Sequence, residues 1–213
     1  MLRLDGAGRA FGRRPIFSGL DLEVASGARL LLAGGNGAGK TTLLRCLAGT
    51  LALSTGRATV AGHPAGSLAA RRLVGVALAP EQTLCGGLSG HDNLMLVARM
   101  RLPRRQATAA VARIEDELAI SEYASVPANR CSAGMRARIS VARALLGDPS
   151  VLLLDEPCRS LDTTARMLLW AALDRRPGLT CVIASHLAED RPRCDHVLAM
   201  PARETVSVAA QPR

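Results

Sequence analysis

A glycine-rich loop that ends in lysine and threonine constrains this chain more than any other part of its sequence. Residues 34–42 read GGNGAGKTT and match the pattern G-x-x-x-x-G-K-[ST] completely. The loop follows the apolar run Arg29–Ala33, and apolar residues then recur at helical spacing between Leu43 and Ala48. A strand, a glycine-rich turn and a helix in this order predict a loop whose backbone N–H groups bind phosphate at a helix N-terminus.

The residue types of the loop indicate which atoms meet the phosphates. The chain has 27 lysine and arginine residues and a formal net charge of +9, yet Lys40 is its one lysine. An ammonium is a compact point charge that fits between phosphate oxygens, whereas a guanidinium is planar and bulkier. We therefore expect Lys40 to bridge the β- and γ-phosphates of a nucleotide and the Thr41 hydroxyl to bind Mg²⁺. The residues expected to bind the nucleotide here are Gly34, Gly35, Asn36, Gly37, Ala38, Gly39, Lys40, Thr41 and Thr42.

Composition excludes several other classes of protein. The chain has two Phe, one Trp and one Tyr, too few to build a base-stacking surface, so we expect no nucleic-acid partner. Its six cysteines form no CxxC pair, which argues against a zinc site or a disulfide framework. The longest apolar run, Met167–Leu173, is too short to cross a membrane, and residues 1–30 do not resemble a signal peptide. These observations predict a cytosolic chain.

A second chemical motif lies in residues 151–157, which read VLLLDEP. An apolar run without alternation predicts a central parallel strand that is buried on both faces. The acids that follow would lie at the carboxyl end of the strand, where open α/β sheets bind their ligands. We expect Asp155 to hold Mg²⁺ through water and Glu156 to orient or deprotonate an attacking water molecule.

Between these motifs, residues 131–135 read CSAGM and lead into an apolar helical face. Ser132 alone fits a helix cap. In combination, however, the motifs resemble those of the ATP-binding-cassette (ABC) ATPases, and the resemblance covers essentially the whole chain. The motifs of that family appear here in family order: the phosphate loop at 34–42, a Q-loop candidate at 80–83, the signature at 131–135, the acids at 155–156, the D-loop at 160–162, and Ser185-His186 after the predicted strand Thr180–Ala184.

The resemblance implies a role for each of these motifs. Two cassettes would pair head to tail with ATP between them, and the signature of one cassette would complete the other's site. The signature residues acting in trans are Ser132, Ala133, Gly134 and Met135, although the family pattern is LSGGQ rather than CSAGM. Phe11 matches the aromatic residue that stacks on adenine, or it is a core or hairpin residue.

The remaining family motifs complete the expected site. His186 would contact the γ-phosphate as a catalytic residue, and Asp162 belongs to the D-loop. For the Q-loop, one alignment selects Glu81 and another selects Gln82.

The family also implies an architecture. The expected fold is α/β, a P-loop NTPase of the ABC ATPase type with a mixed central sheet and an inserted helical subdomain. Residues 1–213 would form one such domain, with a core of about 1–79 and 150–213 and a helical subdomain of about 89–147. After Pro103, one helical face carries Ala107, Val111, Ile114 and Leu118.

The resulting functional prediction is an ATPase subunit that powers export through separate membrane-spanning subunits. It would act as a homodimer with ATP and Mg²⁺ at the cytoplasmic face of the membrane. One alternative is a non-transport ABC protein of translation or DNA repair, which usually has two cassettes or a long coiled coil. A P-loop kinase would need a substrate lid and no signature. The haem exporter of cytochrome c maturation is an alternative sub-family, because its ATPase is short and its signature is similar.

Overall fold

A computed structural model describes residues 1–78, 83–200 and 205–208 of the chain. Strands and helices alternate along most of it, and three short 3-10 helices connect them within the described part. The described strands and α-helices are β1 (Leu2–Phe11), β2 (Arg14–Val24), β3 (Arg29–Ala33), α1 (Lys40–Leu47), β4 (Thr55–Val60), β5 (His63–Pro64), α2 (Leu68–Leu73), β6 (Val74–Ala77), α3 (Gly90–Arg101), α4 (Arg104–Glu117), α5 (Ala133–Leu145), β7 (Val151–Asp155), α6 (Thr163–Asp174), β8 (Thr180–Ala184), β9 (His196–Ala199) and β10 (Thr205–Val208). Among the described residues, no helix combines the length and apolar character that crossing a membrane requires.

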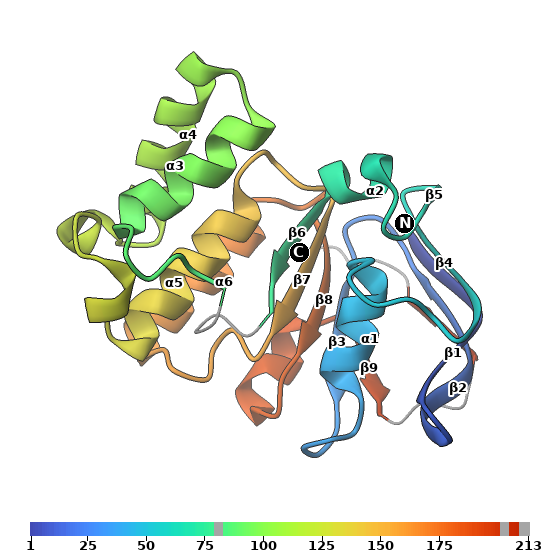
Figure 1. The fold of residues 1–213 in the computed structure, drawn as a ribbon. Helices are drawn as coiled ribbons and strands as arrows, with labels where there is room; N and C mark the ends of the chain where they lie inside the picture. The colour runs from blue at the N-terminus through green and yellow to red at the C-terminus, as the bar shows by residue number, and fades with distance from the viewer. Residues whose placement is uncertain (79–82, 201–204, 209–213) are drawn as a thin grey trace.

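A parallel sheet lies at the centre of the molecule, with the strand order β6-β7-β8-β3-β9 (Figure 1). All five residues of β7 are buried between its neighbours β6 and β8, which confirms the prediction of a central buried strand. Side chains alternate between two apolar cores, since Leu152 and Leu154 enter one while Val151 and Leu153 enter the other. This period of two explains why an unbroken apolar run is needed here.

A second sheet, with the order β10-β2-β1-β4-β5, covers one face of the molecule. It is antiparallel apart from β10, which runs parallel to β2. Helix α1 contacts β7 and β8 of the parallel sheet and β4 of this one, so it lies between the two sheets (Figure 1). The α/β fold is therefore as predicted, but the strands expected in one mixed sheet are divided between two.

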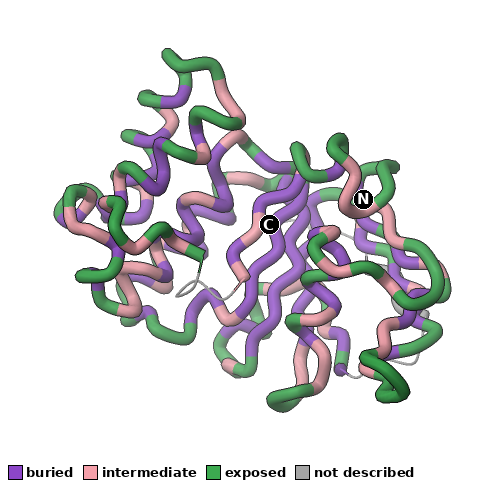
Figure 2. The backbone as a smooth tube through the Cα atoms, viewed as in Figure 1, coloured by how far each residue is buried: buried purple, intermediate pink, exposed green. Residues whose placement is uncertain are grey.

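Helices α5 and α6 cover the opposite face of the parallel sheet, and α3 and α4 extend beyond them (Figure 1). Burial is densest in the parallel strands, whereas α3 and α4 have exposed outer faces (Figure 2). The helix predicted after Pro103 is α4, and its predicted apolar face is buried. The buried residues of that face are Ala107, Val111, Ile114 and Leu118.

Gly75 of β6 marks a close approach between the parallel sheet and α5. A Cβ atom on residue 75 would lie 2.0 Å from the main-chain oxygen of Ala144, near the end of α5. The helix can pack on the strand at this distance only because residue 75 has no side chain. The position of α5, whose first turn follows the CSAGM motif, therefore depends on this contact.

We predict that Gly75→Ala lowers the free energy of unfolding by about 1–3 kcal/mol, because the methyl group overpacks a contact with rigid main chain. Gly178→Ala is the matched control, since a Cβ atom there would meet no atom within 4 Å. The control should change stability by less than about 0.5 kcal/mol. Denaturant unfolding of both variants measures the difference, and equal stability would contradict the close packing of β6 on α5.

Candidate nucleotide-binding site

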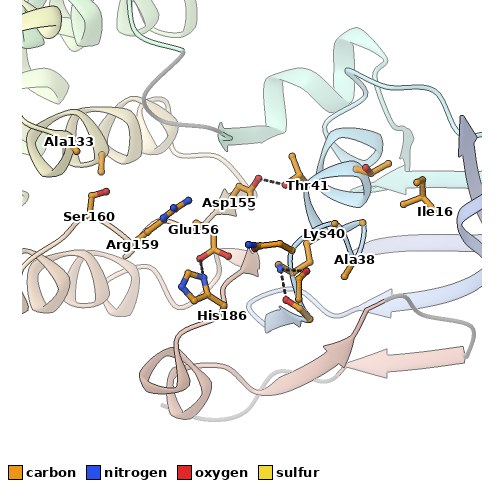
Figure 3. Close-up of a pocket in the computed structure, with 17 residues that line it drawn as sticks. Ile16, Ala38, Lys40, Thr41, Ala133, Asp155, Glu156, Arg159, Ser160 and His186 are labelled. Atoms are coloured by element: carbon orange, nitrogen blue, oxygen red, sulfur yellow. Dashed lines mark hydrogen bonds and ion pairs between the residues drawn. The ribbon is translucent and has the colours of Figure 1, made fainter.

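A cleft of about 700 Å³ lies at the carboxyl ends of three strands of the parallel sheet (Figure 3). The loop after β3, the acids that end β7, and the segment after β8 all reach it. Parallel strands deliver their carboxyl ends to the same edge, which is why motifs far apart in sequence meet here. The lining residues are Ile16, Gly34, Gly35, Asn36, Gly37, Ala38, Gly39, Lys40, Thr41, Thr42, Ala133, Ala137, Asp155, Glu156, Arg159, Ser160 and His186.

Helix α1 presents an uncapped N-terminus to this cleft. Its N-cap residue, Gly39, has φ +98°, and no side chain caps the helix. Side chains do cap α2, α3, α5 and α6. A Cβ atom on Gly39 would lie 2.6 Å from Ile16 Cγ2, so both conformation and space favour glycine here. The first-turn N–H groups of α1 therefore have no side-chain partner and are suited to bind an anion.

Lys40 is almost buried and lies across the loop. Its exposed fraction is 8%, and its Nζ donates to the main-chain oxygens of Gly34 at 2.6 Å and Gly35 at 3.2 Å. These bonds hold the ammonium group over the loop and leave one of its three donors for a further acceptor. The geometry suits a charge that bridges phosphate oxygens.

Thr41 and Asp155 meet across the cleft. The Thr41 Oγ1 hydroxyl donates to Asp155 Oδ2 at 2.6 Å, joining the start of α1 to the end of β7. Burial raises the pKa of the Asp155 carboxyl, an effect that the Thr41 hydrogen bond opposes. A buried carboxylate beside a hydroxyl offers hard oxygen ligands, and a divalent cation would offset the cost of burying its charge. The pair therefore fits Mg²⁺.

Glu156 and His186 form a second pair at the same edge of the sheet. The Nδ1 atom of His186 lies 2.7 Å from Glu156 Oε2 (Figure 3). Glu156 has φ +49°, which is uncommon for a residue with a side chain, and its N–H donates to the Ala184 oxygen at 2.8 Å. This turn places Glu156 in the lining of the cleft, and the hydrogen bond from its own N–H ties the turn to the last residue of β8. Such strain is found at functional sites.

The structure brings only part of the expected CSAGM motif to this cleft. Ala133 lines it, whereas Ser132, Gly134 and Met135 do not. Ser132 is exposed, and its Oγ accepts a hydrogen bond from the Met135 N–H at 3.1 Å as the N-cap of α5. The helix-cap interpretation of Ser132 is therefore confirmed, and its side chain remains accessible from outside the chain.

Four further expected residues lie elsewhere or outside the described residues. Phe11 is 48% exposed at the β1–β2 turn and does not line the cleft; the Arg9 guanidinium lies 4.5 Å from its ring centroid. Asp162 caps α6, with its Oδ1 accepting from the Ala165 N–H at 2.7 Å. The Q-loop candidates Glu81 and Gln82 fall outside the described residues.

Ile16, Ala137 and Arg159 line the cleft although the sequence analysis did not select them. Ile16 comes from β2 of the second sheet, and no local pattern links it to the phosphate loop. Ala137 lies one helical turn after Ala133 in α5, so the helical period could have predicted it. Arg159 follows the acids by three residues, and its charge beside two carboxylates could have drawn attention to it.

Known proteins resemble this chain in sequence. The family described as ABC transporter matches residues 17–159. Nod factor export ATP-binding protein I of Rhizobium meliloti is 31% identical over 93% of this chain, which spans 61% of that relative's length. The protein of the same name from Cupriavidus metallidurans is 32% identical over 97% of this chain and 70% of its own. The phosphonates import ATP-binding protein PhnC of Anaeromyxobacter dehalogenans is 36% identical over 88% of this chain and 41% of its own.

Solved structures share the fold. An ATP binding subunit of an ABC transporter superposes with a TM-score of 0.86 over 97% of this chain and 90% of its own, at 21% identity. The cbiO1 protein of Clostridium perfringens, part of the ABC transporter complex cbiONQ, gives 0.78 over 93% of this chain and 84% of its own, at 26% identity.

We predict that Lys40→Ala weakens Mg·ATP binding by about 10- to 100-fold, because the triphosphate loses a charge-assisted contact. Wild-type protein should melt at a higher temperature with Mg·ATP, since the ligand binds only the folded chain, and the variant should lose this shift. Arg45→Ala is the matched control, because Arg45 lies on the same helix, is exposed and does not line the cleft. Calorimetric affinity of Lys40→Ala equal to that of the wild type would contradict the site.

Proposed function

This chain belongs to the ABC transporter family, and we propose that it binds and hydrolyses ATP to power export through separate membrane-spanning subunits. The observation that carries the proposal is the meeting of two pairs, Thr41 with Asp155 and Glu156 with His186, beside Lys40 in one cleft. Membership of this family also excludes the P-loop kinase class. Export is favoured over import because Nod factor export proteins recur among its relatives.

The phosphates of ATP would bind along the loop of residues 34–42. Main-chain N–H groups at the uncapped start of α1 would hold its oxygens, and the positive end of the helix favours their negative charge. The Lys40 ammonium would exchange part of its contact with the Gly34 and Gly35 oxygens for the β- and γ-phosphates. Phe11 would reach the adenine only after leaving its present place beside Arg9.

Thr41 and Asp155 are the residues that would hold Mg²⁺ next to these phosphates. Their oxygens already meet at 2.6 Å, and the Asp155 carboxylate is buried. When bound, the ion would neutralise charge that develops on the phosphate oxygens. Asp155 would contribute its negative charge, and Thr41 would turn an oxygen lone pair toward the ion while its hydroxyl still donates its hydrogen bond to Asp155.

Glu156 would act on the attacking water molecule. Its carboxylate faces the cleft and would accept the proton that the water loses as the γ-phosphate is cleaved. His186 would hold the Glu156 carboxylate through its Nδ1 and contact the γ-phosphate through the rest of its ring. Glu156 directly follows β7 and His186 lies two residues after β8, so their separation depends on the pairing of Asp155 with Ala184 in the parallel sheet.

The chain would act as a homodimer on its membrane subunits. Ser132 is exposed and lies outside the lining of its own cleft, which supports a role at the nucleotide of a second cassette. Residues of about 89–147, which include α3, α4 and α5, would form the helical subdomain that docks on the membrane subunits. Residues of about 1–79 and 150–213 would form the core, and the assembly would lie at the cytoplasmic face of the membrane.

We predict that Glu156→Gln slows ATP hydrolysis by about 10²- to 10⁴-fold, because the amide keeps the size of the side chain but cannot accept the proton. Lys40, Thr41 and Asp155 remain, so the Kd for Mg·ATP should stay close to that of the wild type. Phosphate release and calorimetry measure the two quantities. Glu122→Gln, a change at an exposed carboxylate outside the cleft, should affect neither. Unchanged hydrolysis in folded Glu156→Gln would remove the catalytic role from this residue.

A second prediction tests the role of Ser132 in trans. Ser132→Arg should abolish ATP-driven dimerisation and hydrolysis while a monomer still binds ATP, because the large side chain blocks contact with the partner's nucleotide. The change also removes a helix cap, which costs about 1 kcal/mol. Ser67→Arg is the matched control, since Ser67 caps α2 through the Ala70 N–H. Light scattering reports dimers. Normal ATP hydrolysis by Ser132→Arg would contradict a role of Ser132 at the partner's nucleotide. An equal loss of hydrolysis in Ser67→Arg would contradict it as well.

A further inference from the structure

We propose that Arg159 is a further phosphate-binding residue, which contacts the terminal phosphate of the nucleotide bound by its own chain. The inference rests on the proposed function, because it assumes that the cleft takes a nucleotide. It adds a residue that the motifs do not select. Its starting point is that Arg159 lines the cleft together with the phosphate loop and both acids (Figure 3).

The main chain around Arg159 is anchored so that its side chain stays in the cleft. The Arg159 N–H donates to the Glu156 oxygen at 3.2 Å, which closes the turn that carries the acid. The segment around it is anchored, because the preceding Cys158 is fully buried and the N–H of buried Leu161, two residues on, donates to the Cys158 oxygen. Arg159 itself is exposed. The turn that places Glu156 at the cleft therefore places Arg159 there as well.

The charges around the cleft favour an anion beside Arg159. Its lining includes two cations, Lys40 and Arg159, and two carboxylates, Asp155 and Glu156. Lys40 already donates to two main-chain oxygens. Within residues 1–78 and 83–200, the Arg159 side chain makes no hydrogen bond or ion pair. Beside the Mg²⁺ proposed at Asp155, Arg159 adds a second protein cation to Lys40 and so lowers the repulsion between the two carboxylates and a polyphosphate.

The chemistry of arginine fits this position. A guanidinium remains charged at all physiological pH values and can donate two parallel N–H bonds to two oxygens of one phosphate. Figure 3 shows the Arg159 side chain extending toward Asp155 and Glu156 rather than away from the cleft. Because Glu156 is the proposed base at the γ-phosphate, a cation on the same turn would meet the terminal phosphate first. Arg159 should therefore favour ATP over ADP.

The test compares nucleotide affinities of Arg159→Ala and Arg159→Lys with those of the wild type. Calorimetry with Mg·ATP and Mg·ADP is done at protein concentrations at which light scattering reports monomers, so that only the chain's own cleft contributes. Arg159→Ala should lose about tenfold in affinity for ATP, the scale of one charge-assisted hydrogen bond, and less for ADP. Arg159→Lys should retain part of the preference for ATP. Arg72→Ala, at an exposed arginine of α2 outside the cleft, should change neither affinity.

Two results would overturn the proposal. One is an unchanged affinity for ATP in Arg159→Ala, and the other is an equal fold loss for ATP and ADP, which would exclude the terminal phosphate as the contact. Failure of the proposed function is distinguishable, because the wild-type chain would then bind neither nucleotide. Melting curves without nucleotide establish that the variants are folded, and we expect them to match the wild type because the Arg159 side chain is exposed.

Discussion

The hydrogen bond between Thr41 and Asp155 joins the two halves of the site, and the rest of the arrangement depends on it. It connects the first turn of α1 to the end of β7 at 2.6 Å, although 114 residues separate the two in sequence. Strands β3 and β7 are not neighbours, since β8 lies between them. The bond therefore forms only when all three strands are paired in register with their carboxyl ends at one edge. The geometry of the site therefore depends on the register of the parallel sheet.

The helices that pack on the two faces of the parallel sheet have different roles. On one side, α1 packs between the two sheets, and its uncapped N-terminus faces the cleft. On the other side, α5 approaches β6 so closely that Gly75 cannot carry a side chain. The first helix binds the nucleotide, in our proposal, and the second presents Ser132 outward. The two carboxylates, Asp155 and Glu156, lie at the end of β7 and directly after it.

Much of this arrangement could be predicted from local sequence. The strands predicted at Arg29–Ala33 and Thr180–Ala184 have those bounds in the structure, because buried parallel strands need unbroken apolar runs. The division of the strands between two sheets could not be predicted, since the pairing of β1 with β2 and β4 depends on contacts between distant residues. For the same reason Ile16 was missed, because it enters the cleft through tertiary packing. Arg159 enters through the local turn that it shares with Glu156, but no motif marks it. Phe11 matched a motif, yet it lies beside Arg9 and away from the cleft.

The central claim is that main-chain N–H groups of residues 35–42 bind the triphosphate, and hydrogen–deuterium exchange tests it most directly. On addition of saturating Mg·ATP to the wild-type chain, we expect exchange to slow in peptides covering residues 35–42. Peptides from α4, far from the cleft along the outer face of the molecule, serve as the internal reference and should exchange at the same rate as before. Unchanged exchange in residues 35–42 at saturating nucleotide would contradict the account.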